Sequence, residues 1–244
     1  EMNMPQPDFV ACCNNICNCM IKWYENIARE LDIPFIMIDV PYNNEYEAEE
    51  DRVAYLKGQF DHAIKQLEEI SGKKWDDEKF QEVMDISQRT GRAWLDATGY
   101  AKYTPSPFSG FDVFNHMAVA VCARGKLESA IAFEKLAEEF AENVKTGKST
   151  FKGEEKYRII FEGIACWPHL RHTFKGLKDN GVIVVGTVYA DAFGYIYGNT
   201  NELMQAYCGT PNAISYERSL DMRLKLAKEN NVDGMLVHIN RSCK

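Results

Sequence analysis

Two short apolar runs, one near each end of the chain, are each followed at once by a turn that carries a cysteine. The run at 9–11 precedes a turn that ends at Cys17, and the run at 235–237 precedes a turn that ends at Cys243. Short apolar runs bounded in this way are typical of strands, and open α/β sheets bind their ligands at the turns that follow strands. Two soft thiolates at equivalent corners suit a metal cluster held between two similar half-domains better than a disulfide.

Composition limits the class of protein. The chain has 244 residues, 45% of them hydrophobic, which is enough for one large domain or two small ones. A net charge of -8 argues against nucleic acid or an anionic membrane as a partner, because both need clustered cations. No apolar stretch approaches the ~20 residues that span a bilayer, and the N-terminus has no basic-then-apolar signal pattern. We therefore expect a cytoplasmic protein with no nucleic-acid or membrane partner.

The chain is rich in cysteine, and reducing cytosol disfavours disulfides, so catalysis, metal binding or burial must explain the thiols. Four of them lie within eight positions near the N-terminus: Cys12, Cys13, Cys17 and Cys19. Three others stand alone in the sequence: Cys122, Cys166 and Cys208. For these three we expect simple burial, because a free cysteine behaves as a small apolar side chain.

The apolar pattern divides the chain into three parts. Residues 1–46 read as strand, helix and strand at 8–13, 20–31 and 34–40, a βαβ unit that forms a partial N-terminal α/β domain. Residues 47–150 form a helical segment, because apolar residues recur there at spacings of three and four. A proline-rich loop at 104–110 interrupts the helices.

Residues 151–244 alternate strand and helix and predict a second parallel sheet. Strands are expected at 157–166, 182–189 and 234–238, and helices at 168–178, 202–207 and 215–229. Because the chain stops one residue after Cys243, we expect this domain to be truncated at its C-terminus, and the start at Glu1 indicates a missing N-terminal part as well. The fold class is α/β, with two Rossmann-like parallel-sheet half-domains joined by a helical segment.

Four stretches of the sequence together resemble the α-subunit of the 2-hydroxyacyl-CoA dehydratases, the family of the 2-hydroxyisocaproyl-CoA and 2-hydroxyglutaryl-CoA enzymes. They are PDFVACCNNICNCMIKWYENIARELDIPF, PSPFSGFDVFNHMAVAVCARGK, FEGIACWPHLRH and DGMLVHINRSCK. The wider group includes benzoyl-CoA reductase subunits. The resemblance extends over essentially the whole chain, and the CCNNIC and NRSCK turns are its specific parts.

The resemblance implies a hydro-lyase of anaerobic amino acid fermentation, which removes water from an (R)-2-hydroxyacyl-CoA to give an (E)-2-enoyl-CoA. It implies a heterodimer with a β-subunit, a [4Fe-4S] cluster held by three cysteines, and an ATP-dependent iron–sulfur activator that delivers one electron. The β-proton of a 2-hydroxyacyl thioester is too weakly acidic for ordinary elimination, so an electron is added first and a ketyl radical forms. Two alternatives stay open: a reductase of aromatic acyl-CoA of the benzoyl-CoA type, and a non-catalytic iron–sulfur electron-transfer subunit.

The resemblance also suggests cluster ligands. Cys243 matches the C-terminal ligand of the family. The N-terminal ligand is either Cys13 at the strand end or Cys17 at the expected helix start, where the helix N-terminus favours a thiolate. The Asn-x-x-Cys spacing shared with the other turn favours Cys17. The third ligand of the family lies upstream of the first motif, so we expect it outside this fragment, because no cysteine precedes Cys12.

Two polar residues at strand ends are catalytic candidates. His238 ends an apolar strand and is either a core imidazole or an acid–base group beside the cluster. Glu162 lies in an otherwise apolar strand, where an unpaired carboxylate is costly to bury, so it either faces solvent or has a dedicated partner.

Further polar residues lie close to the same turns. Arg171, Lys175 and Arg241 are candidates for binding the phosphates of coenzyme A. Ser106 and Ser109 in the proline-rich loop are candidates for lining the acyl pocket. The sequence has no Gly-x-x-x-x-Gly-Lys-Ser/Thr loop, no Gly-x-Gly-x-x-Gly fingerprint and no Gly-x-Ser-x-Gly elbow, so we expect nucleotide use to belong to the activator.

Overall fold

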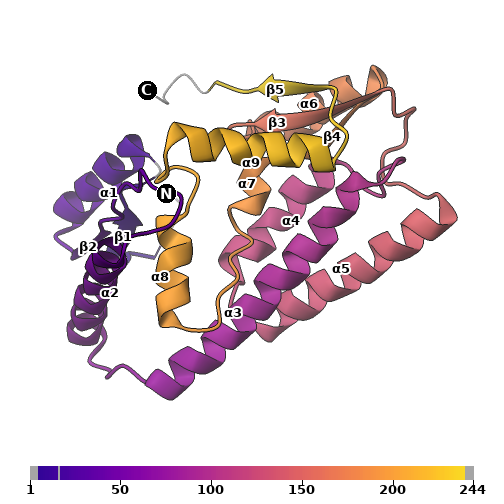
Figure 1. Ribbon diagram of the computed structural model, residues 1–244. Helices are drawn as coiled ribbons and strands as arrows, with labels where there is room; N and C mark the ends of the chain where they lie inside the picture. Colours follow the sequence, from indigo (N-terminus) through magenta and orange to yellow (C-terminus); the bar gives the residue numbers. More distant parts are fainter. Residues whose placement is uncertain (1–4, 16, 240–244) are drawn as a thin grey trace. The chain divides into compact units, whose positions relative to one another are not determined.

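The computed structural model describes residues 5–15 and 17–239 (Figure 1). These residues form two compact units, one made of 5–78 with 199–216 and the other of 79–198 with 217–239. Each unit has a hydrophobic core of its own. The predicted boundaries near residues 46 and 150 stay predictions.

The first unit begins with the predicted βαβ element. Strand β1 (Val10–Cys13), helix α1 (Asn18–Leu31) and strand β2 (Phe35–Ile38) follow in order, and the two strands pair in parallel with Val10 opposite Phe35. Helix α1 ends where Asp32 takes a left-handed conformation with φ 52°. The strand–helix–strand prediction is confirmed.

Two helices far apart in the sequence complete the first unit. Helix α2 (Glu50–Ser71) contacts helix α8 (Thr200–Cys208) and strand β2. Leu56 of α2 and Cys208 of α8 are fully buried in a shared core that also contains Met204. Asn199 caps α8, its side-chain oxygen accepting the Glu202 N–H at 2.9 Å. The local pattern predicts helix α8 but not the unit to which it belongs.

The predicted helical segment is present. After α2 its helices are α3 (Asp77–Thr98), α4 (Gly110–Cys122) and α5 (Leu127–Thr146), with a short 3₁₀ turn η1 (Gly99–Lys102) after α3. A capping box begins α4, because the Ser109 side chain accepts a backbone N–H while the Asp112 carboxylate accepts the Ser109 N–H at 3.0 Å. The proline-rich loop therefore ends in a well-defined helix start.

The second unit contains a three-stranded parallel sheet in the order β4-β3-β5. The strands are β3 (Tyr157–Glu162), β4 (Val182–Gly186) and β5 (Gly234–Val237). The connecting helices are η2 (Trp167–His169), α6 (Leu170–Asp179), α7 (Val188–Asp191) and α9 (Tyr216–Glu229). Two parallel sheets with helices between their strands confirm the α/β prediction.

Two of the predicted strands are too long. The strand expected at 157–166 ends at Glu162, because Gly163 turns the chain out of the sheet with φ 93°. The strand expected at 182–189 ends at Gly186, and helix α7 begins at Val188. Apolar residues continue past both ends because they enter buried turns, so hydrophobicity alone does not mark where pairing stops.

Helix α4 lies very close to the sheet. A side-chain carbon at Gly110 would overlap Val184 of β4, so the first turn of the helix can approach the strand only as glycine. Further along, Phe114 of α4 packs edge-on against Phe161 of β3, with ring centroids 5.5 Å apart. Phe174 of α6 joins the same aromatic cluster, 5.9 Å from Phe114. This packing fixes α4 and α6 on the sheet.

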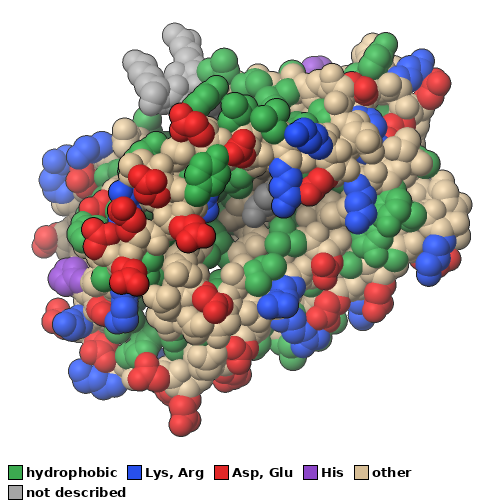
Figure 2. All heavy atoms as spheres, viewed as in Figure 1, with side chains coloured by type: hydrophobic (Ala, Val, Ile, Leu, Met, Phe, Trp, Pro, Cys, Tyr) green, Lys and Arg blue, Asp and Glu red, His purple; other side chains and the backbone are tan. Residues whose placement is uncertain are grey.

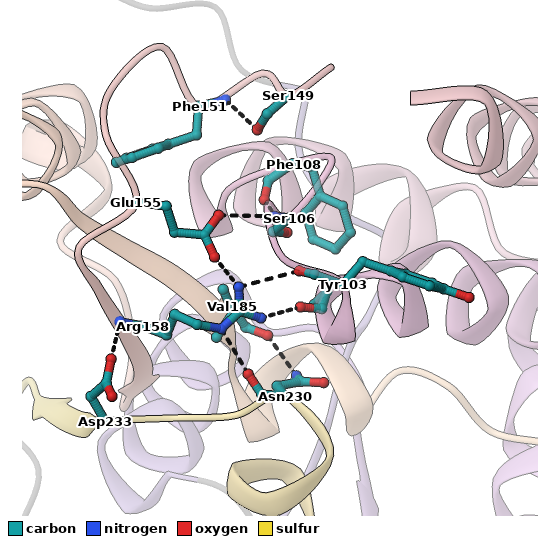
Figure 3. Close-up of polar contacts among 11 residues, drawn as sticks. Tyr103, Ser106, Phe108, Ser149, Phe151, Glu155, Arg158, Val185, Asn230 and Asp233 are labelled. Carbon is teal, nitrogen blue, oxygen red and sulfur yellow. Dashed lines mark hydrogen bonds and ion pairs between the residues drawn. The ribbon is translucent and has the colours of Figure 1, made fainter. Parts of the chain in front are cut away.

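A buried ion pair fixes strand β3 to its neighbours (Figure 3). Arg158 is 6% exposed and pairs with the carboxylate of Glu155. Its guanidinium also donates to three carbonyl oxygens, those of Asn230 at 2.9 Å, Tyr103 at 3.2 Å and Ala101 at 2.6 Å. Its backbone N–H donates to the Asp233 carboxylate at 2.8 Å. The pair therefore holds β3 against η1 and against the turn that enters β5.

The surface carries mixed charge. On the face that Figure 2 shows, acidic and basic side chains are interspersed among apolar ones. Among the helices that the structure describes, none combines the length and the apolar character needed to cross a bilayer.

Candidate functional site

The first candidate site is a cysteine corner at the carboxyl end of β1. Cys13 is the last residue of the strand, and Cys17 is the N-cap of α1 with extended backbone angles. The Cys17 carbonyl oxygen accepts the N–H groups of Met20 at 3.0 Å and Ile21 at 3.2 Å, which starts the helix. Both cysteines are half-buried free thiols. The predicted placement of Cys13 at a strand end and Cys17 at a helix start is confirmed, whereas their roles as ligands stay predictions.

Burial sets the protonation of the thiols on the strand. It raises the pKa of the Cys13 thiol, and backbone N–H groups of Asn15 and of Cys13 itself partly oppose the shift. Burial also raises the pKa of Cys12, followed by the effect of the neighbouring Cys13. A metal that binds Cys13 must therefore displace a proton that the thiol holds more firmly than an exposed cysteine does.

The two asparagines between these cysteines were not predicted as site residues. The Asn14 amide donates to the Asp39 carboxylate, and its oxygen accepts the Val40 N–H at 2.8 Å, so this side chain joins the ends of β1 and β2. The Asn15 amide donates to the Thr210 hydroxyl at 3.0 Å. The sequence signal that could have identified them is the Asn-x-x-Cys spacing, which the turns before Cys17 and Cys243 share. In the first motif the function of the asparagine is to fix the turn that presents the thiols.

The described residues do not complete a metal centre. Within 5–15 and 17–239, no group of three or more histidine, cysteine, aspartate or glutamate side chains has an arrangement that could hold a metal ion. Cys243 and Arg241 lie outside the described residues. Thiolates fit an iron–sulfur cluster in kind, but the described residues do not bring three such ligands together.

The second candidate site is a histidine corner at the carboxyl ends of β3 and β5. The His238 N–H donates to the Glu162 carbonyl at 2.9 Å and extends the strand pairing by one residue. Its ring Nδ1 lies against the Ile164 carbonyl oxygen, which can only accept, so Nδ1 is the donor in this contact. A side-chain carbon at Gly163 would overlap the His238 carbonyl oxygen. Glycine is therefore required for this close approach.

Glu162 has a dedicated partner. Its carboxylate accepts two hydrogen bonds from the Arg223 guanidinium of α9, at 2.8 and 3.0 Å. Arg223 in turn donates to the Ser219 carbonyl at 2.8 Å, which holds it in place. Of the two alternatives for Glu162, pairing is the one found, and its catalytic role stays a prediction. An acidic residue in an apolar strand indicates that a cation is near, but not which one.

The two candidate serines have different surroundings. Ser106 is fully buried, and its hydroxyl donates to the Phe108 carbonyl at 2.7 Å. Its N–H donates to Glu155 at 2.9 Å, which links the proline-rich loop to the buried ion pair. Ser109 caps α4 and lines a cavity. Their assignment to substrate binding stays a prediction, and the contacts of Ser106 are those of a structural residue.

That cavity, here called the α4–α6 pocket, has a volume of about 340 Å³. Residues 109–112, the loop at 150–152, helix α6 and strand β4 enclose it. The pocket brings together three residues that the sequence suggests for acyl-CoA binding: Ser109, Arg171 and Lys175. His169 and His172, near the start of α6, are exposed.

Simple burial does not hold for two of the three isolated cysteines. Cys122 at the end of α4 and Cys166 in the turn after β3 are exposed, so that prediction is wrong for both. An apolar stretch of sequence surrounds Cys122, but the thiol falls on the outer side of the helix end. Cys208 is fully buried as predicted, and burial raises its pKa.

Comparison with known proteins assigns the family. Residues 1–244 match the family model described as 2-hydroxyglutaryl-CoA dehydratase, D-component. The chain belongs to this family. The family resemblance inferred from the four stretches of sequence is thus confirmed.

Three relatives of the D-component family are similar over the full length of the chain. It is 64% identical to the (R)-phenyllactyl-CoA dehydratase alpha subunit of Clostridium sporogenes over 100% of the chain and 60% of that protein. It is 54% identical to the alpha subunit of (R)-2-hydroxyglutaryl-CoA dehydratase of Acidaminococcus fermentans over 100% of the chain and 51% of that protein. It is 51% identical to the (R)-2-hydroxyisocaproyl-CoA dehydratase alpha subunit of Clostridioides difficile over 100% of the chain and 60% of that protein. The chain thus spans between half and two thirds of these relatives.

Proposed function

We propose that the chain is part of the iron–sulfur subunit of an (R)-2-hydroxyacyl-CoA dehydratase, which eliminates water to give an (E)-2-enoyl-CoA. Membership of the D-component family over the whole chain carries this proposal. The three relatives differ in the acyl group that their names specify, so the proposal covers the reaction and not the acyl chain. The function requires a partner subunit and an activator that delivers an electron.

The proposed cofactor is a [4Fe-4S] cluster. Cys17 or Cys13, together with Cys243, are the residues of this chain proposed to hold it, and a further ligand is needed. When bound, such a cluster supplies an electron at low potential. The extended backbone at Cys17 and the Asn14 contacts across the strand ends support the assignment, because they present the thiols from a fixed turn.

We assign proton transfer to Nε2 of His238. The Ile164 carbonyl fixes the ring tautomer, so Nε2 can accept a proton without rearrangement of the ring. One-electron reduction of the thioester to a ketyl radical anion expels the 2-hydroxyl group as hydroxide, and the β-proton of the resulting enoxy radical is acidic enough for such a base. The electron is given back when the enoyl-CoA forms. Glu162 acts through Arg223 in this proposal, because both of its oxygens are already bound to the guanidinium. It is therefore a positioning residue.

The test uses the full-length protein with its partner subunit, prepared without oxygen. Cys243→Ser should lose cluster iron and dehydration together. Cys122→Ser, which removes an exposed thiol at the end of α4, is the matched control and should retain both. Normal iron and normal activity in Cys243→Ser would refute the ligand assignment.

Product analysis separates the alternatives. Mass spectrometry of the thioester products, with an added activator, should find an enoyl-CoA that has lost water. A ring-reduced thioester would instead establish an aromatic acyl-CoA reductase. Reduction of the cluster with no binding of any acyl-CoA would establish an electron-transfer subunit.

A further inference from the structure

The α4–α6 pocket concentrates positive charge in a protein whose net charge is -8. Four cationic side chains line it: Lys152 from the loop before β3, and Arg171, Lys175 and Lys178 from α6. The acidic residue of its lining is Asp112, whose carboxylate is bound by the Ser109 N–H at 3.0 Å and the Thr150 hydroxyl at 2.5 Å. The cations therefore exceed the anions at this site.

Three of these four cations have no ion pair with any described residue. Lys175 pairs with Asp179, and the Lys152 ammonium donates to the Ser149 carbonyl at 2.8 Å. Arg171 and Lys178 make neither kind of contact within the described part of the chain and are exposed at the pocket, and Lys178 acts on the Asp179 carboxylate only through its charge. They lie seven residues apart on α6, about two helical turns, and so project from the same side of that helix.

The wall behind the cations is apolar and aromatic. Phe111, Phe151 and Phe174 line the pocket together with Val182 and Val184 of β4. The Phe111 and Phe174 rings meet edge to face with centroids 5.6 Å apart, which leaves a rigid wall against which a flat ring can pack. A volume of about 340 Å³ falls within the usual range for small-molecule sites.

We propose that the α4–α6 pocket binds the phosphorylated adenosine end of the coenzyme A thioester. This inference rests on the proposed function. It specifies which end of the substrate binds in the pocket. The pantetheine portion of such a thioester carries no charge and the acyl group carries one at most, whereas the 3′-phosphate and 5′-diphosphate carry several negative charges. Arg171 and Lys178 bind the phosphates and the phenylalanine wall packs against the adenine ring. A free adenine nucleotide shares this chemistry, and the test distinguishes the two sources.

The test measures binding of adenosine 3′,5′-bisphosphate by calorimetry to the full-length protein with its partner subunit. This probe contains the phosphorylated adenosine but neither the pantetheine nor the acyl group. Arg171→Gln combined with Lys178→Gln should weaken binding at least tenfold, because two charge-assisted contacts are lost. Lys135→Gln combined with Lys228→Gln removes the same charge from exposed positions outside the pocket and should leave binding unchanged.

A second variant tests the aromatic wall. Phe151→Ala should weaken binding of the adenosine probe several-fold and leave the weaker binding of pyrophosphate unchanged. Equal weakening in the two double variants, or no binding of the probe to the wild type, would overturn the proposal. Binding of ATP that coenzyme A does not displace would also overturn it, since the site would then serve a free nucleotide.

The outcomes separate this inference from the proposed function. If the protein forms an enoyl-CoA and the Arg171 and Lys178 double variant keeps the wild-type KM for the thioester, the pocket assignment is wrong and the function stands. If coenzyme A competes with the probe at the pocket but no thioester loses water, the dehydratase function is wrong and the pocket assignment stands.

Discussion

Replacing Arg158 should reveal how strongly the buried ion pair holds the second unit together. Arg158→Met keeps most of the side-chain length and removes the charge. The Glu155 carboxylate is then left buried with the Ser106 N–H, and the carbonyls of Ala101, Tyr103 and Asn230 lose a donor. Loss of one partner from a buried pair costs about 3–5 kcal/mol of unfolding free energy.

Urea unfolding followed by tryptophan fluorescence and by circular dichroism measures this loss. With a slope of about 2 kcal/mol per molar urea, the midpoint should fall by roughly 1.5–2.5 M. Lys156→Met is the control, because Lys156 also pairs with a glutamate but with side chains that are 52% and 76% exposed. An exposed pair contributes at most about 1 kcal/mol, so this variant should move the midpoint little.

A double variant tests the reasoning itself. Arg158→Met combined with Glu155→Met removes both charges, so no unpaired carboxylate remains in the core. It should be more stable than Arg158→Met alone, because replacing a whole buried pair by apolar residues is far less costly than breaking it. A single variant that loses less than about 1 kcal/mol, or a double variant less stable than the single one, would refute the assignment of this stabilisation to the pair.

Three further predictions concern particular residues. Gly163→Ala should destabilise the protein clearly more than Gly72→Ala, since both glycines have positive φ (93° and 68°) but only at Gly163 does an added carbon meet a backbone oxygen; equal losses of thermal midpoint would contradict this. Iodoacetamide should modify Cys122 and Cys166 in the native protein and Cys208 only after unfolding, as read by peptide mass spectrometry. Because burial raises the pKa of Cys208, its neutral thiol supports folding below the unfolded pKa of about 8.5, and this support is lost as pH rises through the higher folded value. Cys208→Ala should therefore show a shallower loss of stability above pH 8.5 than the wild type, and an unchanged slope would argue against the buried thiol.

Much of the architecture follows from local pattern. Apolar residues spaced by three and four predict helix throughout 47–150, where α2, α3 and α5 are found. Strand ends are harder, because Gly163 and Gly186 end pairing while the sequence beyond them stays apolar. The membership of α8 in the first unit depends on contacts across more than a hundred residues, which no window of sequence contains.

In the candidate sites, too, the positions of residues were predictable from the sequence but their partners were not. The turns that carry Cys13, Cys17 and His238 were predictable, because each follows a short apolar run. The partners were not, because Arg223 reaches Glu162 from another helix, 61 positions along the chain. Long-range pairs of this kind depend on tertiary packing, and a single sequence holds no record of them.

The late position of helix α8 in the sequence has a consequence for the order in which the chain folds during synthesis. Met204 and Cys208 fill the core around Leu56. The core of the first unit therefore cannot form until the ribosome has synthesised α8, which lies nearly 150 residues after Leu56 in the chain. The second unit is largely synthesised by then, as an insertion inside the first. Until α8 is synthesised the apolar side of α2 lacks the helix that covers it, and apolar surface exposed in this way favours aggregation during folding.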